Sequence, residues 1–199
     1  NAHTNLDKTD GGVNHQLGKI LGLYNDTLLG FSESLPQFGF GRVGDIEKTQ
    51  LKNYINVIKD KLDIDYLKVY GNQEREVQRV AVCGGSGSEF IMDAYRKGAC
   101  IYITGDIKYH DAQLGTELGL TIIDARHYHT EKIILPFIKE YLERESKYMS
   151  DLANLVETLE RIGIPREWSK KRYLSNIDWN EVKKYEIDTK IDQTLNTQP

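Results

Sequence analysis

Residues 100–112 have the sequence CIYITGDIKYHDA, in which an apolar run with strand character is followed by a segment with helical character. The same alternation occurs on both sides of it. The apolar run RVAVC at 79–83 precedes a predicted helix that ends at Gly98, and LTIID at 120–124 precedes a predicted helix over 130–144. Strands that alternate with helices of this length are typical of βαβ units. We therefore expect an α/β fold with a mixed, largely parallel sheet and helices on both of its faces.

Composition and pattern divide the chain into three segments. Residues 1–65 are expected to end a first α/β half and connect it to the next, and residues 66–144 to form a second α/β half that begins with a strand at 66–70. Residues 145–199 carry no strand signal and are expected to form a helical tail. The finer expectations are, in chain order, a strand end with a polar loop (1–10), a helix (13–21), a Gly-rich loop or short strand (24–44), a helix (46–61), and two short helices in the tail (166–174 and 179–185).

Bulk properties exclude several function classes. Hydrophobic residues make up 39% of the 199 positions and charged residues 28%, which is typical of a soluble globular protein. The apolar runs are too short to span a membrane, and the net charge of -4 gives no general attraction to nucleic acid. The N-terminus has neither a signal-peptide pattern nor a Met, so we expect a fragment or a processed product. Cys83 and Cys100 form no C-x-x-C pair, which favours buried free thiols and the cytoplasm.

The strongest functional signal is the segment from Asp124 to Glu131, DARHYHTE, directly after an apolar strand. His127 and Glu131 are four residues apart, so on a helix both side chains project from one face and can bind one metal ion or two neighbouring ions. His129 would point about 200° away from His127, so it is not expected to bind the same ion. The alternative is a plain helix N-terminus, capped by Thr130 and surrounded by solvated charges.

Four further residues are weaker candidates when taken alone. Asp106, at the end of a strand, could be a base, a partner for a ligand histidine or a helix cap. His110 could be a general acid or base, or a helix-terminal histidine bonded to its neighbour or to solvent. His3 and Asp7 would be turn or capping residues unless the fold brings them near His127.

A glycine-rich segment, GGSGS at residues 84–88, follows a predicted strand and precedes a predicted helix. Its backbone amides could bind a phosphate. The alternative is a tight turn in which Ser86 or Ser88 caps the helix.

Taken together, these segments resemble the NIF-three-like dinuclear-metal family, whose members are often described as GTP cyclohydrolase type I homologues. Six motifs, in family order over residues 1–143, carry the resemblance: AHTNLD (2–7), GGVN (11–14), GFGRVG (39–44), VCGGSG (82–87), TGDIKYHDA (104–112) and DARHYHTE (124–131).

The resemblance implies two similar α/β halves, a ring-shaped homo-oligomer and two divalent metal ions in a cleft, for which Zn, Fe, Mn and Mg all suit the donors. It also implies hydrolytic opening of the GTP purine ring, with a nucleotide as the small-molecule substrate. The residues that it assigns are Asp7, His127 and Glu131 as metal ligands, His110 and Asp106 as catalytic residues, and His3, Thr104 and Gly105 as substrate-binding residues.

Three departures separate this chain from the family pattern. The chain begins at the third metal-site motif, without the N-terminal part that carries a His-His motif. Arg126 and His129 stand where the family usually has Gly and Ala, and Arg126 places a cation beside the site that would disfavour a metal or attract a phosphate. The 145–199 tail lies outside the resemblance.

Two functions therefore stay open at the level of sequence. The first is a metal-dependent hydrolase-type protein with a dinuclear site. The second is a non-enzymatic metal-binding or protein-interaction scaffold, either as it stands or as a portion of a longer protein. Two ions per chain would indicate catalysis, and one or none would indicate a scaffold.

Overall fold

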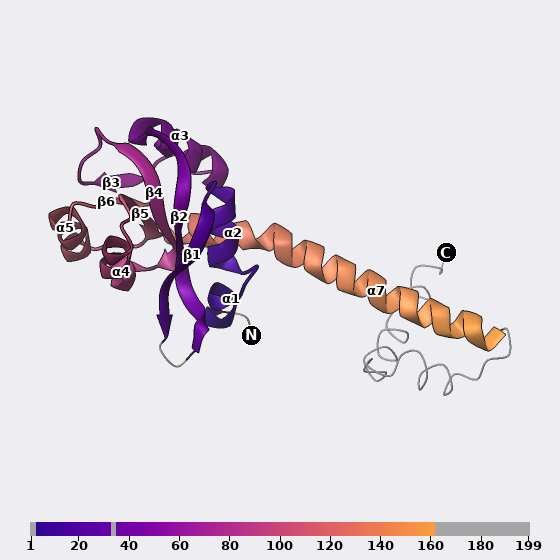
Figure 1. Ribbon diagram of the computed structural model, residues 1–199. Helices are drawn as coiled ribbons and strands as arrows, with labels where there is room; N and C mark the ends of the chain where they lie inside the picture. Colours follow the sequence, from indigo (N-terminus) through magenta and orange to yellow (C-terminus); the bar gives the residue numbers. More distant parts are fainter. Residues whose placement is uncertain (1–2, 33–34, 162–199) are drawn as a thin grey trace. The chain divides into compact units, whose positions relative to one another are not determined.

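The computed structural model describes residues 3–32 and 35–161 (Figure 1). The elements in chain order are α1 (Thr4–Lys8), α2 (Val13–Ile20), β1 (Tyr24–Ser32), β2 (Leu35–Gln50), α3 (Leu51–Leu62), β3 (Lys68–Tyr70), β4 (Glu76–Ser86), the 3-10 turn η1 (Ser88–Phe90), α4 (Ile91–Arg96), β5 (Ile101–Gly105), α5 (Tyr109–Glu117), β6 (Thr121–Asp124), α6 (His127–Glu131), the 3-10 turn η2 (Lys132–Ile134) and α7 (Leu135–Arg161).

Within the described residues, all strands join one six-stranded sheet in the order β1-β2-β4-β5-β6-β3. The central strands β4, β5 and β6 run parallel. On one side β2 pairs antiparallel with β4, and β1 pairs antiparallel with β2. On the other side the short strand β3 pairs antiparallel with β6. The predicted mixed sheet is confirmed, and its parallel part is its centre.

Helices cover both faces of the sheet, as predicted (Figure 1). The reason is the alternation of side chains along each strand, which sends neighbouring residues to opposite faces. Successive residues of β4 and β5 enter different cores. The core with α2 and α3 takes Val80, Val82, Ile101 and Ile103, and the core with α4 and α5 takes Ala81, Cys83 and Tyr102. The central strands are thus apolar on both faces, which is typical of parallel strands.

The structure corrects three predictions in the first 65 residues. Residues 4–8 form the helix α1, where the end of a strand was expected. Residues 24–32 and 35–44 belong to the antiparallel pair β1 and β2, where a loop or short strand was expected over 24–44. Residues 46–50 extend β2, so the helix predicted from residue 46 begins only at Leu51. Pairing of Thr49 and Gln50 with β4 overrides their local pattern.

Glycines explain why the 24–44 stretch resembles a loop in sequence but forms strands. Gly41 has a φ of +66°, which a residue with a Cβ rarely adopts. A Cβ at Gly30 would lie 2.6 Å from Cδ1 of Phe90, so β1 can approach η1 closely only with glycine there. Here the glycines permit close packing of strands, which sequence composition does not distinguish from a flexible turn.

By its internal contacts the chain forms two compact units, Asn1–Leu135 and Pro136–Pro199. Strands β2 and β4 pair in one sheet across the first predicted boundary, after residue 65. The division into two α/β halves and a tail stays a prediction. In the second unit the described part is helical, since α7 continues to Arg161. The helices predicted at 166–174 and 179–185 lie outside the described residues. No helix in the described part is long and apolar enough to cross a membrane.

Truncation of one buried strand residue tests this packing. Ile103 on β5 is fully buried between sheet and helices, so Ile103→Ala is expected to lower the free energy of unfolding by about 2 to 5 kcal/mol. Val57→Ala on α3 is the matched control, because Val57 is 41% exposed and its truncation should change stability by less than about 0.5 kcal/mol. Urea denaturation of both variants measures the difference, and equal midpoints would contradict the assigned core.

Candidate functional site

The candidate site lies where the three parallel strands end. The carboxyl ends of β4, β5 and β6 carry Gly85, Asp106 and Arg126 at or directly beyond them. Helix α6 follows β6 and contacts both β4 and β5. The carboxyl edge of a parallel sheet is the usual ligand-binding edge of α/β proteins.

His127 lies between two carboxylates at this edge. Its Nδ1 is 2.7 Å from Oδ2 of Asp106, and its Nε2 is 3.0 Å from Oε1 of Glu131. Helix α6 begins at His127, three residues before the predicted start at residue 130, so the i,i+4 pair shares one face as expected. Asp106 could have been a base, a histidine partner or a cap, and the structure shows it as the partner of His127. Both ring nitrogens must donate a hydrogen to satisfy two ionised carboxylates, which requires the imidazolium form.

The charges of the site shift two pKa values. The hydrogen bond that His127 donates to Asp106 raises the pKa of His127 above its ordinary 6.5. Partial burial lowers this pKa, and the negative charge of Glu131 raises it further. The pKa of Asp7 on α1 is also raised, first by burial and then by the negative charge of Glu131, while His3 and His127 oppose the shift. The fold therefore brings Asp7 within electrostatic range of His127 and Glu131, although at least 120 residues separate Asp7 from them in sequence.

Side chains from three elements bind the amides of the glycine-rich segment. The Gly84 N–H donates to Oδ1 of Asn14 at 2.8 Å. The Gly85 N–H donates to Oγ1 of Thr130, and the Gly87 N–H to Oγ1 of Thr104, both at 3.0 Å. These three amides are therefore already hydrogen-bonded within the chain. The possible phosphate cradle at 84–88 is therefore not supported, and β4 itself continues to Ser86.

Gly85 leaves the space in which His127 and Glu131 meet. It has a φ of +68°, and a Cβ there would lie 3.3 Å from Nε2 of His127 and would overlap Oε1 of Glu131. Gly105, predicted to bind substrate, has a similar role. A Cβ at Gly105 would lie 2.6 Å from the backbone nitrogen of His127, so β5 can approach α6 only with glycine there.

Asn14 is a positioning residue of the candidate site that the sequence did not single out. It is 2% exposed, and besides accepting from Gly84 it donates from Nδ2 to the backbone oxygen of Asp7 at 3.0 Å. It therefore ties the segment that carries Asp7 to the end of β4. The available signal was an amide side chain directly after Val13 on the buried side of an amphipathic helix, within the GGVN motif.

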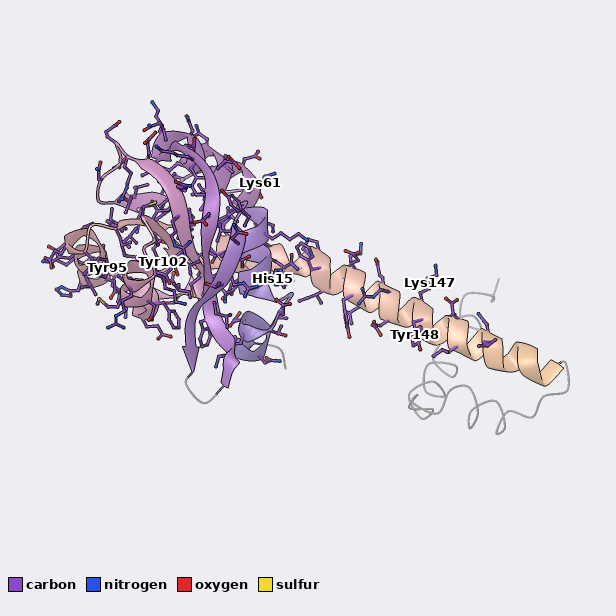
Figure 2. All side chains as sticks on the ribbon, viewed as in Figure 1. His15, Lys61, Tyr95, Tyr102, Lys147 and Tyr148 are labelled. Carbon is purple, nitrogen blue, oxygen red and sulfur yellow. The ribbon has the colours of Figure 1, made fainter. Side chains whose placement is uncertain are left out.

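Thr104, predicted to bind substrate, is fully buried. Its hydroxyl accepts from Gly87 and donates to the Gly85 oxygen at 3.2 Å. The adjacent Tyr102, which lies in the interior (Figure 2), donates from its hydroxyl to the Gly87 oxygen at 2.6 Å. Thr104 thus positions the glycine segment in this structure, and its contact with a substrate stays a prediction.

The remaining predicted residues lie at the surface. His3 precedes α1 and is exposed, with its Nδ1 3.3 Å from the Thr4 hydroxyl. His110 is exposed on the first turn of α5, where its ring packs edge-on against Tyr109. Among the described residues His110 has no hydrogen bond to the His127 cluster, so its catalytic role stays a prediction. His129 faces away from His127, as predicted, and its Nδ1 lies 3.3 Å from the Leu62 oxygen.

The Cys83 thiol is unsuited to nucleophilic chemistry. Cys83 and Cys100 are both free, as expected, with Cys83 buried and Cys100 half-buried. Burial raises the pKa of the Cys83 thiol to about 12, so the thiolate is scarce at neutral pH.

The donor types fit a divalent ion, because imidazole and carboxylate groups gather around a space that Gly85 leaves open. The Asp106 carboxylate on Nδ1 would also orient Nε2 of His127, a common arrangement for histidine ligands. In the described arrangement, however, no group of three or more His, Cys, Asp or Glu side chains converges at coordinating distance.

The sequence profile of the Duf34/NIF3 (NGG1p interacting factor 3) family matches residues 1–159. The chain belongs to this family. The resemblance inferred from the six motifs is confirmed.

Curated Duf34/NIF3 relatives carry the description GTP cyclohydrolase 1 type 2 homolog. The relative from Streptococcus pneumoniae is 40% identical over 131 residues, which cover 64% of this chain and 49% of that protein. The relative from Clostridium perfringens is 35% identical over 140 residues, covering 70% of this chain and 53% of that protein. The chain thus spans about half the length of these relatives.

Solved structures agree on the fold. A Bacillus cereus protein related to NIF3 superposes with a TM-score of 0.68 at 21% identity, covering 74% of this chain and 67% of that chain. HcgD from Methanocaldococcus jannaschii superposes with a TM-score of 0.61 at 30% identity, covering 72% of this chain and 55% of that chain.

A pH titration tests the pair of Asp106 and His127. Because the partner carboxylate raises the folded-state pKa of His127, the pair stabilises the fold fully below pH 6.5 while Asp106 is ionised, and this contribution is lost as pH rises through the raised pKa. Asp106→Asn is expected to lower the pKa of His127, measured by NMR titration of the imidazole in chelator-treated protein. Asp60→Asn, an exposed carboxylate on α3, is the control. An unchanged His127 pKa in Asp106→Asn would contradict the pairing.

Two glycine substitutions test the space around His127. Gly85→Ala and Gly119→Ala both place a Cβ at a positive φ, +68° and +81° respectively, so each should destabilise the fold by about 1 kcal/mol or more. Only Gly85→Ala also displaces His127 and Glu131, since Gly119 has no atom within 4 Å of the added Cβ. Imidazole NMR signals of His127 should shift in Gly85→Ala alone, and equal spectra in both variants would refute the close approach.

Proposed function

We propose that this chain contributes Asp7, His127 and Glu131 to a divalent-metal site of a hydrolase-type protein. The observation that carries the proposal is the contact of Glu131 and His127 beside Gly85, with the carboxylate of Asp7 in electrostatic range. Two carboxylates that repel each other at one site favour a cation between them. A bound divalent ion would activate a water molecule for attack on a substrate.

The chain's own residues would prepare that chemistry. Asp106 holds Nδ1 of His127, which fixes the ring and directs Nε2 toward Glu131. Asn14 holds the backbone of Asp7 against the end of β4. Asp106 and His110 are the proposed proton-transfer residues, and His3 and Thr104 the proposed substrate contacts.

The description of the relatives as GTP cyclohydrolase 1 type 2 homologs supports a nucleotide, such as GTP, as the substrate. The proposed reaction is hydrolytic opening of the purine ring. Because the chain spans about half of those relatives, the activity of the whole protein stays a proposal, as do two metal ions per site and a homo-oligomeric ring. The free thiols support the cytoplasm as the proposed location.

The alternative is a scaffold that binds metal or a protein partner without catalysis. One observation favours it: in the part of the chain that the structure describes, fewer than three candidate ligands converge. Catalytic sites usually have three protein ligands and one open position. The number of metal ions bound per chain separates the two functions.

Metal content tests the site directly. His127→Ala and Glu131→Ala are each expected to lose most bound metal, because each removes a proposed ligand, while the fold stays intact. The measurement is mass spectrometry of metals on chelator-washed chain reconstituted separately with Zn, Mn, Fe and Mg. His129→Ala is the matched control, since His129 lies two residues away and faces the Leu62 oxygen instead.

Full metal content in both His127→Ala and Glu131→Ala would refute the site. Near two equivalents in the unmodified chain would support catalysis, and a GTP hydrolysis assay would follow. Near zero equivalents in the unmodified chain would refute metal binding by this chain alone and favour the scaffold.

A further inference from the structure

A second feature of the carboxyl edge is a pocket on the side of Asp106 that faces the short strand β3. It has a volume of about 180 Å³ and is lined by Tyr66, Leu67, Lys68, Asp106, Asp124 and Arg126. Asp106 borders this pocket while its Oδ2 holds His127. The pocket therefore adjoins the candidate metal site and shares one residue with it.

The two carboxylates of the pocket already have hydrogen-bonding partners within the chain. Asp106 is paired with His127 at 2.7 Å. Asp124 is 6% exposed, and its Oδ1 accepts the backbone N–H of Arg126 at 3.0 Å. Their negative charge is thus partly balanced within the chain.

The two cationic side chains of the pocket, by contrast, have no such partners in the described part of the chain. Across residues 3–32 and 35–161, neither the Lys68 ammonium nor the Arg126 guanidinium makes an ion pair or a side-chain hydrogen bond. The guanidinium lies 5.5 Å from the ring centre of Tyr66, which is itself 56% exposed. This stacking leaves the N–H groups in the guanidinium plane available to a ligand.

The backbone of Arg126 adds a second observation. Its φ of +64° and ψ of +148° lie in a region that glycine adopts readily and that costs other residues about 1 to 3 kcal/mol. Arg126 keeps this backbone conformation although it costs free energy, and its long cationic side chain stays at this position. Strain of this kind is concentrated at ligand sites.

The volume limits the ligand. Pockets for whole small molecules usually measure about 300 to 1,000 Å³, so this pocket fits one group of a molecule better than a complete nucleotide. An oxyanion matches both the size and the two unpaired cations, because guanidinium and ammonium groups form charge-assisted hydrogen bonds with phosphate or carboxylate oxygens.

We propose that this pocket is an anion subsite, in which Arg126 and Lys68 bind a phosphate or carboxylate group of the molecule that occupies the neighbouring site. The proposal rests on the proposed function only for the existence of that neighbouring site. The guanidinium packs against the Tyr66 ring, and Asp106 borders the pocket while it is paired with His127.

Titration of inorganic phosphate into chelator-treated chain tests the subsite. Backbone amide NMR shifts of Tyr66, Lys68 and Arg126 should saturate. Loss of either cation in Arg126→Gly or Lys68→Gln should weaken binding about tenfold, the equivalent of one charge-assisted hydrogen bond. Glycine suits the backbone of residue 126, so Arg126→Gly is expected to fold. Lys61→Gln, on α3 (Figure 2), removes an exposed lysine outside the pocket and should bind phosphate like the unmodified chain.

Unchanged phosphate affinity in Arg126→Gly and Lys68→Gln would overturn the subsite, and so would an equal loss in Lys61→Gln. Acetate titrated in parallel distinguishes a carboxylate preference from a phosphate preference. Because the titration is free of metal, its failure is independent of the proposed function. Phosphate binding without metal uptake would support the subsite and refute the metal site, and metal uptake without phosphate binding would do the reverse.

Discussion

The carboxyl end of β4 approaches α6 so closely that Gly85 has no room for a side chain, and the rest of the site depends on this approach. Hydrogen bonds maintain it. Asn14 from α2, Thr130 from α6 and Thr104 from β5 each accept one glycine amide of the segment. The three side chains are buried, so these bonds form away from competing water and fix the three elements relative to one another.

This rigid edge carries a cluster of charges at the surface. Two carboxylates, Asp106 and Glu131, pair with His127, and the negative charge of Glu131 acts on the carboxyl of Asp7. The cluster therefore holds more negative than positive charge. Such an arrangement is suited to a cation. In the pocket that Asp106 also borders, the available charge is positive, because Arg126 and Lys68 have no anionic partner among the described residues. One edge of the sheet thus places the proposed metal site beside the proposed anion subsite.

The second half of the fold could be predicted from the sequence, and the first half only in the helices α2 and α3. Residues 79–124 alternate between apolar strands and helices, and each strand is buried on both faces, so local pattern and tertiary structure agree. In residues 24–50 they disagree. Glycines such as Gly30 and Gly41 resemble a loop in composition, yet they are needed for close packing of β1 and β2 against their neighbours. Local pattern carries no information about that packing.

The sequence by itself determined that His127 and Glu131 share a face, because residues four apart on a helix always do. It also determined the strands that place them at the sheet edge. Only the tertiary structure decided what surrounds them. Asn14 binds an amide 70 residues away, and Asp106 binds a ring 21 residues away. The partners of a buried polar group are set by which elements pack together. Helical and strand periodicity describe one element at a time and cannot supply that information.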